Sequence, residues 1–410
     1  MSDSTLPALL LKRGEARRLR AGHLWVFSNE IAVAKTPLTG FAAGDAVRIL
    51  DAGGRPLGTG YVNPSTLIAA RLVDRGGHAL DASLLVHRLN VALSLRARRY
   101  PGAPFYRLAF GESDGLPGLV LDRFGDVIVG QTTTAGMERL KPQVEDAVRK
   151  VLDPSAMIWK NDAGARALEA LPSEVGVAFG TVDGPLRVEE GGLVFELDAL
   201  GGQKTGWFYD QRANRDQLAP WVGGGAKVLD LFSYVGAWGL RAAAFGAGEV
   251  TCVDGSQPAV DAVRRHAALN GLSDRVNAVC ADAFEFLKDA RAERRRWDVV
   301  VVDPPAFIKK RKDLREGTLA YRRSNEMAMQ VLERDGLLVS CSCSHHMSRD
   351  ALLREINAGA RHLDRQVQAL QVLQFSQGRA SLIAVRAVEG GSMVQHVISD
   401  LPQLVPGLPM

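Results

Sequence analysis

The chain has little cysteine, with four residues in 410. They are Cys252, Cys280, Cys341 and Cys343, and their number and clustering in one half of the chain do not fit the disulfide framework of a small secreted protein. No cysteine or histidine pair has the spacing of a zinc site, so we expect no bound metal. We interpret Cys252 and Cys280 as small buried apolar side chains.

A long apolar run is also missing. The short run at residues 8–11 is followed at once by basic residues, and it has neither the order of a signal peptide nor the length of a membrane span. We therefore expect a cytoplasmic protein without a membrane partner. With 410 residues the chain exceeds the roughly 250–300 residues that one core supports, so two or three domains are expected.

The basic residues are gathered in clusters, although the formal net charge is only +4. The clusters lie at residues 12–20, 96–99, 294–296 and 309–312. One such cluster is usually a solvated face, but four of them favour a nucleic-acid partner, because phosphates are bound by lysine and arginine.

The strand and helix patterns predict three domains and a tail. Residues 1–75, with strands at 46–50 and 67–72, resemble a small β-barrel. Residues 76–190 are expected to form an α+β domain. Its predicted elements are helices at 82–99 and 140–152, a strand pair within 119–131 and a strand at 157–160.

Residues 191–395 alternate short apolar strands with helices, which is typical of an α/β, Rossmann-like domain with a mostly parallel sheet. The predicted strands are residues 227–231, 249–253, 276–280, 298–302 and 336–340, and a helix is predicted at 257–269. Residues 396–410 are expected to be a C-terminal tail.

The first of these parallel strands runs into a glycine turn that begins at Asp230 and contains Phe232, Tyr234 and Gly236. A dinucleotide fingerprint needs glycine where this chain has Tyr234, so the pattern fails for NAD. Asp230 would repel a pyrophosphate, whereas it would attract the ammonium group of S-adenosylmethionine. The turn therefore favours the methyl donor.

Acidic residues also follow the next two strands. Asp254 can accept the hydrogen bonds of a ribose diol, and Asp282 can accept one from the adenine amino group, with Phe284 stacking nearby. Each carboxylate alone would more often be a helix N-cap. Together they support the cofactor interpretation.

The fourth strand ends in Asp303-Pro304-Pro305-Ala306-Phe307. Two prolines make a rigid extended turn at the edge of the sheet where ligands bind, and a flat base can rest there. Enzymes that methylate an exocyclic amine place an aromatic residue directly after the prolines. Here that position is Ala306, which weakens this reaction as an interpretation.

Cys343 follows the fifth strand, and carbon 5 of a pyrimidine can be methylated only after a nucleophile adds to carbon 6. Cys341 lies two residues earlier and would face the same side of the strand, so the pattern alone leaves both open. Cys343 is nearer the ligand edge and is our candidate, while Cys341 is interpreted as apolar. His345, His346 and the lysine-rich segment after Phe307 are candidates for raising the thiolate fraction.

These motifs together resemble the RlmI-type family of large-subunit ribosomal RNA cytosine-5 methyltransferases. Residues 22–28 (GHLWVFS) are similar to the start of the PUA domain of that family, and 111–118 (GESDGLPG) and 203–212 (QKTGWFYDQR) to its central and pre-sheet motifs. Beyond about residue 377 the sequence departs from the family pattern. No cysteine comes directly after Pro304, which distinguishes the chain from the two-cysteine RNA cytosine methyltransferases but is shared by RlmI-type members.

The resemblance implies a PUA domain, a central domain and a class I methyltransferase domain that makes 5-methylcytosine in 23S ribosomal RNA, and we leave a homodimer open. It implies that Asp303 holds the cytosine edge and that Cys343 attacks. The cofactor candidates, from pattern and resemblance, are Lys204, Thr205, Gly206, Asp210, Gln211, Arg212, Asp230, Phe232, Tyr234, Gly236, Asp254, Asp282, Phe284 and Asp303. The substrate candidates are Pro304, Pro305, Phe307, Lys309 and Lys310.

Two alternatives stay open. Related enzymes methylate guanine, but they carry other residues where this chain has Cys343. A non-catalytic RNA-binding assembly factor would not need to keep the acidic strand ends that this sequence has.

Overall fold

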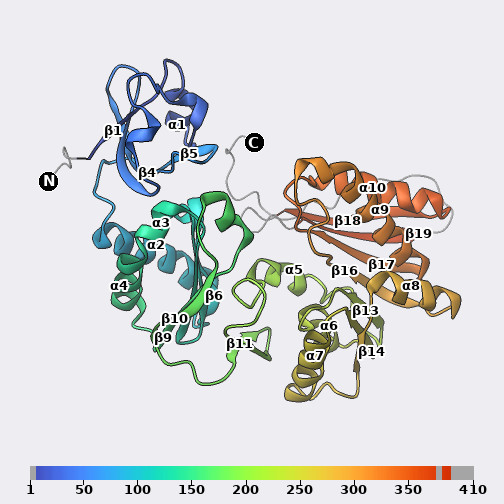
Figure 1. The fold of residues 1–410 in the computed structure, drawn as a ribbon. Coiled ribbons are helices and arrows are strands. Elements are labelled where there is room, and N and C mark those ends of the chain that lie inside the picture. Colours follow the sequence, from blue (N-terminus) through green and yellow to red (C-terminus); the bar gives the residue numbers. More distant parts are fainter. Residues whose placement is uncertain (1–5, 375–380, 389–410) are drawn as a thin grey trace. The chain divides into compact units, whose positions relative to one another are not determined.

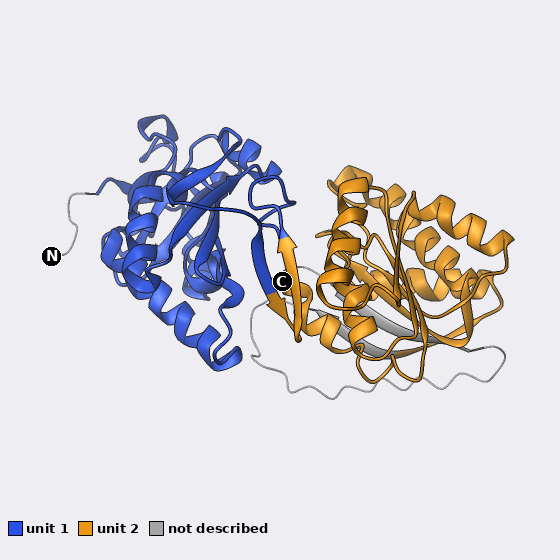
Figure 2. Ribbon diagram, turned by 90° about the horizontal axis from the view of Figure 1, so that it is seen from below, with its two compact units in different colours: residues 1–188, 197–207, 406–410 blue, residues 189–196, 208–405 orange. Residues whose placement is uncertain are grey.

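The computed structural model describes residues 6–374 and 381–388. Within these ranges the chain divides into two units (Figure 2). The first comprises the residues up to 188 together with 197–207, and the second comprises 189–196 and everything described from 208 onward. In this part of the chain no helix combines the length and the apolar character that crossing a membrane requires.

The first unit begins with a five-stranded sheet in the order β1-β3-β4-β5-β2, in which only the β1–β3 pair is parallel. Its elements are β1 Ala8–Leu10, α1 Ala16–Arg20, β2 Trp25–Phe27, β3 Asp45–Leu50, β4 Pro56–Val62 and β5 Ile68–Asp74 (Figure 1). Val47 and Ile49 lie two residues apart on β3, so their side chains point to the same, inner face of the sheet. Both are fully buried, together with Leu9 and Leu19 of the same core.

A second five-stranded sheet, in the order β10-β9-β8-β7-β6, completes the first unit. Its elements are α2 Ala82–Arg99, β6 Phe105–Phe110, β7 Leu119–Phe124, β8 Val127–Thr132, α3 Ala135–Arg139, α4 Lys141–Leu152, β9 Ala156–Asn161 and β10 Glu174–Gly180. Helix α2 begins after Asp81, whose Oδ1 accepts a hydrogen bond from the Leu84 N–H at 3.0 Å. Its buried side chains Leu85 and Leu89 pack in the core over this sheet.

The third sheet lies in the second unit and has the order β15-β14-β13-β16-β17-β19-β18. Its strands are β13 Lys227–Leu231, β14 Glu249–Asp254, β15 Val276–Cys280, β16 Trp297–Val302, β17 Leu332–Ser342, β18 Gln366–Gln374 and β19 Ser381–Val388. The first five run parallel, and β19 is antiparallel to both of its neighbours.

Helices cover both faces of this sheet (Figure 1). They are α6 Ala237–Ala244, α7 Gln257–Leu269, α8 Ala283–Ala292, α9 Leu314–Gln330 and α10 Arg349–His362, and the short helix α5 Arg212–Asp216 contacts α6. Leu229 and Leu231 point into a core made with α8, α9 and α10. Asp230, one residue out of step, points to the opposite face and accepts a hydrogen bond from Gly239 of α6.

Short segments connect these elements. The strands β11 Leu186–Glu190 and β12 Leu193–Leu197 form a two-stranded sheet where the chain passes from one unit to the other. The 3-10 helices are η1 Ser28–Glu30, η2 Leu38–Gly40, η3 Gly111–Asp114, η4 Gly164–Glu169, η5 Tyr209–Gln211 and η6 Arg311–Asp313.

The structure confirms the predicted α/β fold with its mostly parallel sheet, and all five predicted parallel strands are present. One prediction was wrong: Cys280 is exposed, because β15 is the edge strand of the sheet and Cys280 ends it. The domain boundaries at 75/76 and 190/191 stay predictions, and the predicted tail at 396–410 lies outside the described residues.

Candidate active site

The parallel register brings the predicted strand ends to one edge of the third sheet. Leu231 of β13 pairs with both Val253 of β14 and Val302 of β16, and Val302 pairs with Ser340 of β17. The residues that follow these positions are therefore neighbours across the strands. Open α/β sheets bind ligands at this edge.

The turn after β13 has an unusual backbone. Phe232 and Tyr234 have positive φ values of 60° and 49°, in the left-handed region that side chains rarely adopt, and Gly236 follows at 83°. The φ of Gly236 would strain any side chain, and a Cβ there would lie 2.7 Å from a methyl carbon of Leu240, which would have to shift. The Tyr234 N–H donates to Asp254 Oδ2 at 2.8 Å, which fixes the turn against β14. Such strain is typical of ligand-binding turns.

Asp230 lies beneath this turn and is completely buried. Its Oδ2 accepts a hydrogen bond from the Gly239 N–H at 2.9 Å, while its buried Oδ1 has no hydrogen-bond partner in the described part of the chain. Burial, reinforced by the nearby carboxylates of Asp303 and Asp254, raises the pKa of Asp230 to about 8. A bound ammonium group would satisfy this acceptor and offset the crowding of negative charge.

Asp254 and Asp282 are both tied to backbone N–H groups. Asp254 Oδ1 accepts from Ser256 at 2.9 Å, and Asp282 Oδ1 caps α8 by accepting from Phe284 at 2.9 Å and Glu285 at 3.1 Å. The N-cap role that competed with the cofactor role for Asp282 is thus real. It does not remove the cofactor role, because a carboxylate oxygen accepts more than one hydrogen bond.

Asp303 lies directly after β16 and accepts hydrogen bonds from side chains of other segments. The Gln211 side-chain amide donates to its two oxygens at 3.3 and 3.1 Å, and the indole N–H of Trp238 donates to Oδ2 at 3.0 Å. Gln211 was among the predicted cofactor residues, but Trp238 was missed. The signal was its place between Gly236 and Gly239 in the turn motif.

The two cysteines of the fifth strand are in different environments. Cys341 pairs within the sheet and is buried, and burial together with the carboxylate of Asp303 raises the pKa of its thiol well above the usual range. Cys343 lies just beyond the end of β17 and is partly exposed, and its thiol donates to the Pro304 carbonyl at 3.7 Å. Of the two, Cys343 is the accessible thiol beside the proline turn.

A buried tyrosine joins the two segments that carry Asp303 and Cys343. The hydroxyl of Tyr321, on α9, lies 2.8 Å from Ser344 Oγ, which also accepts a hydrogen bond from the Ile308 N–H at 3.1 Å. Burial raises the pKa of Tyr321. Tyr321 therefore links Ser344, next to Cys343, with the turn that follows Pro305.

Three aromatic side chains that were predicted separately form one cluster. The ring of Phe232 lies 6.3 Å from that of Phe284 and 6.4 Å from that of Phe307, and Phe284 and Phe307 are 6.4 Å apart. Tyr321 packs edge-on against Phe307 at 4.9 Å. Aromatic surface thus extends continuously from the predicted adenine side to the predicted base side.

Seven further predicted residues lie on three other segments of the chain. Lys204, Thr205 and Gly206 belong to the first unit, where the Thr205 hydroxyl donates to Asp122 at 2.6 Å. Lys309 and Lys310 are exposed beyond the proline turn. The predicted positions Asp210 and Arg212, at η5 and the start of α5, belong to the second unit.

Two family models match the chain. A PUA-like domain matches residues 9–75, and an S-adenosylmethionine-dependent methyltransferase matches residues 176–374. Within the described ranges no group of histidine, cysteine and acidic residues could hold a metal ion.

Curated relatives match almost the whole chain. A protein of Klebsiella pneumoniae (strain 342) called ribosomal RNA large subunit methyltransferase I is 34% identical over 397 residues, which is 95% of this chain and 97% of that protein. One with the same name from Shewanella denitrificans is 35% identical, with 88% of this chain and 91% of that protein covered.

Solved structures share the fold. A SAM-dependent methyltransferase from Streptococcus mutans matches with a TM-score of 0.78 at 19% identity, and the match covers 93% of this chain and all of that one. A methyltransferase structure complexed with SAH has a TM-score of 0.79 at the same identity and coverage.

Proposed function

The chain belongs to the family of ribosomal RNA large subunit methyltransferase I, and from this premise we propose that it methylates carbon 5 of a cytosine in large-subunit ribosomal RNA. It is an S-adenosylmethionine-dependent methyltransferase. The observation that carries the cytosine assignment is the accessible thiol of Cys343, 3.7 Å from the carbonyl of Pro304.

The residues at the sheet edge fit the cofactor. The unsatisfied Oδ1 of Asp230 suits the ammonium group, the strained turn at Phe232 and Tyr234 suits close approach of a ligand, and Asp254 suits the ribose hydroxyls. Asp282 and Phe284 suit the adenine. When bound, the cofactor supplies an electrophilic methyl group, and the acidic side chains favour its positive charge.

The protein provides the nucleophile. The Cys343 thiolate adds to carbon 6 of a flipped cytosine, and the ring electrons then make carbon 5 nucleophilic toward the methyl group. Loss of the carbon 5 proton restores the double bond and expels the thiolate. Cys341 is the poorer nucleophile, because burial and the neighbouring carboxylate disfavour its anion.

Asp303 is placed to hold the cytosine. Gln211 and Trp238 fix its carboxylate at the end of β16, and the next residue, Pro304, carries the carbonyl that contacts the thiol. A cytosine ring at this position can donate its amino hydrogens to the carboxylate or to the carbonyl. Phe307, three residues further along the chain than Pro304, is our candidate for contact with the ring.

The test is a covalent trap. Ribosomal RNA that contains 5-fluorocytosine, incubated with the protein and S-adenosylmethionine, should form an adduct that resists denaturation, because fluorine cannot leave as a proton does. Cys343→Ala should abolish the adduct, and the matched control Cys341→Ala should retain it. An adduct that persists in Cys343→Ala would contradict the assignment, and methylated guanine in the product would favour the competing reaction.

We keep two further predictions as proposals. The first is that the protein acts in the cytoplasm on ribosomal RNA. The second is that it forms a homodimer in solution, which light scattering can test. A measured mass of 44.2 kDa would contradict the dimer, and twice that mass would support it.

A further inference from the structure

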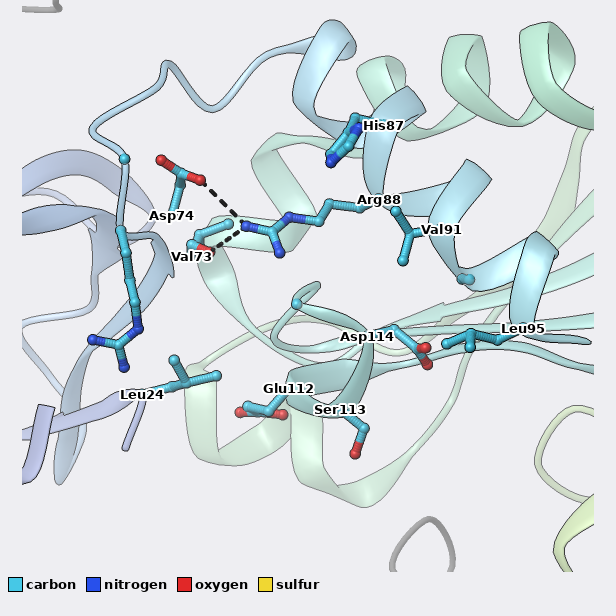
Figure 3. Close-up of a pocket in the computed structure, with 14 residues that line it drawn as sticks. Leu24, Val73, Asp74, His87, Arg88, Val91, Leu95, Glu112, Ser113 and Asp114 are labelled. Carbon is cyan, nitrogen blue, oxygen red and sulfur yellow. Dashed lines mark hydrogen bonds and ion pairs between the residues drawn. The ribbon is translucent and has the colours of Figure 1, made fainter. Parts of the chain in front are cut away.

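The first unit contains a cavity of about 400 Å³ that takes no part in the proposed chemistry (Figure 3). Its walls are Leu24 before β2, residues 73–76 at the end of β5, one face of α2 and residues 112–115 in and after η3. Sites for small ligands span roughly 300–1,000 Å³, so the cavity has room for one nucleotide-sized group.

Two of the specific sequence motifs, 22–28 and 111–118, meet at this cavity. The Trp25 indole N–H donates to Glu112 Oε1 at 2.6 Å although the two residues are 87 positions apart. Asp114 is held by a two-pronged ion pair with Arg96 at 2.5 and 2.7 Å. The motifs therefore give the cavity a rigid wall.

The α2 wall exposes apolar surface. Val91 and Leu95 are one helical turn apart, and 48% and 51% of their surfaces are accessible, unlike the buried Leu85 and Leu89 of the same helix. Figure 3 shows both side chains pointing from α2 toward the cavity, with Leu24 on the other side. Exposed apolar side chains that line a cavity are typical of ligand sites.

Polar groups with unused hydrogen-bonding capacity also line the cavity. Glu112 is 35% exposed, and no hydrogen bond involves its Oε2 within the described residues. The side chains of Ser113 and His87 also line the cavity, and they too take part in no hydrogen bond within the described residues. These groups can accept hydrogen bonds from a ligand that carries N–H donors.

Positive charge lies at the same place. Arg75 is exposed, and its guanidinium donates to the His23 carbonyl at 3.3 Å. Arg88 reaches across the cavity to Asp74 at 3.3 Å and to the Val73 carbonyl at 3.4 Å, and its buried Nε has no partner in the part of the chain that the structure describes. Because Arg88 is paired with Asp74, the exposed Arg75 is the group that would stabilise a phosphate here.

We propose that this cavity holds one unpaired nucleotide of the RNA substrate, with the base against Val91 and Leu95, its N–H edge toward Glu112 and its phosphate toward Arg75. The proposal rests on the proposed function in taking RNA as the ligand. Unpaired bases are recognised by packing against a protein surface and by hydrogen bonds to their edges. In this cavity Val91 and Leu95 would supply an aliphatic packing surface in place of an aromatic ring. A site remote in sequence from the catalytic residues would position the RNA without touching the cytosine.

The first test locates the contact. A transcript of large-subunit ribosomal RNA that carries 6-thioguanosine or 4-thiouridine is irradiated with the full chain, and the crosslinked peptides are identified by mass spectrometry. Peptides that contain residues 87–95 or 112–115 are expected. Crosslinks confined to other peptides, such as the basic cluster at 12–20, would overturn the proposal.

The second test uses matched charge insertions. Leu95→Glu and Arg75→Glu should each weaken binding of the same transcript by about tenfold or more. Leu269→Glu is the control, because Leu269 is also 48% exposed and ends α7, at the opposite edge of the sheet from the candidate site. S-adenosylmethionine affinity should be unchanged in all three. Equal RNA affinity in cavity variants and control would overturn the proposal.

The two proposals can fail separately. Formation of 5-methylcytosine together with unaffected RNA binding in the cavity variants would remove the nucleotide site alone. Crosslinks at the cavity without any 5-methylcytosine would remove the cytosine assignment alone.

Discussion

Replacing Asp230 with asparagine tests the buried carboxylate at the base of the cofactor turn. Asparagine has nearly the same shape and keeps an oxygen for the Gly239 N–H, but it carries no charge at any pH. The structure raises the pKa of Asp230 to about 8, first through burial and then through the carboxylates of Asp303 and Asp254. The substitution therefore removes one titration and changes little else.

The size of the expected stability change follows from the difference between the pKa values of Asp230 in the folded and the unfolded chain. An unfolded aspartate has a pKa near 3.9, so holding Asp230 protonated at pH 7 costs about three pH units at about 1.36 kcal/mol each, or at most roughly 4 kcal/mol. Because the folded pKa is raised, the contribution of Asp230 to stability is greatest below about pH 4 and falls as the pH rises toward 8. Asp230→Asn lacks this fall, so its advantage should grow from near zero at pH 4 to several kcal/mol at pH 7.

The affinity for S-adenosylmethionine should fall, although the folded chain becomes more stable. If Asp230 binds the ammonium group of the cofactor, its loss removes a charged hydrogen bond worth about 1.5–3 kcal/mol and weakens S-adenosylmethionine binding by about 10- to 100-fold. Binding to the original chain should also release a proton near pH 7, because the cation favours the carboxylate form.

Urea unfolding between pH 4 and 8 and calorimetry in buffers of different ionisation enthalpy measure both effects. The control is Asp261→Asn, on the exposed face of α7, where an ion pair contributes little. Parallel pH profiles of stability for Asp230→Asn and the original chain would refute the buried-acid reasoning. Unchanged cofactor affinity would refute the role of Asp230 in binding.

Other predictions concern the groups around the thiol. Trp238→Phe removes the indole hydrogen bond to Asp303 and should lower kcat/KM for RNA by roughly tenfold with little effect on S-adenosylmethionine affinity, as steady-state kinetics would show. Tyr321→Phe should lower kcat and cost about 1–2 kcal/mol of stability in urea unfolding, because Ser344 loses a buried partner; wild-type kcat would contradict its positioning role. A thiol reagent should modify the exposed Cys280 and the accessible Cys343 in the folded protein while Cys252 and Cys341 stay unmodified, as mass spectrometry would show; Cys280→Ala should keep wild-type activity and still be inactivated by the reagent through Cys343.

The sequence predicted the strand ends well for a physical reason. Alternation of apolar strands with helices requires a parallel sheet, and a parallel sheet brings Asp230, Asp254 and Asp303 to one edge whatever the details of packing. The exposure of Cys280 was missed because it depends on which strand forms the edge of the sheet. The order of the strands cannot be predicted from the sequence of any one segment. The contact between Trp238 and Asp303 spans 65 residues and depends on packing in the same way.

The choice between Cys341 and Cys343 shows how much depends on where a strand ends. Alternation along a strand predicts that both thiols face the same side, and on that basis both could reach a ligand. Strand β17 ends at Ser342, however, so Cys341 lies inside the sheet between paired strands while Cys343 follows the end of the strand. A thiolate inside the sheet would face the carboxylate of Asp303 at low dielectric, which raises the free energy of the anion. The thiol of Cys343, one residue beyond the end of β17, reaches solvent and the proline turn. Nucleophilic attack is therefore favoured from Cys343.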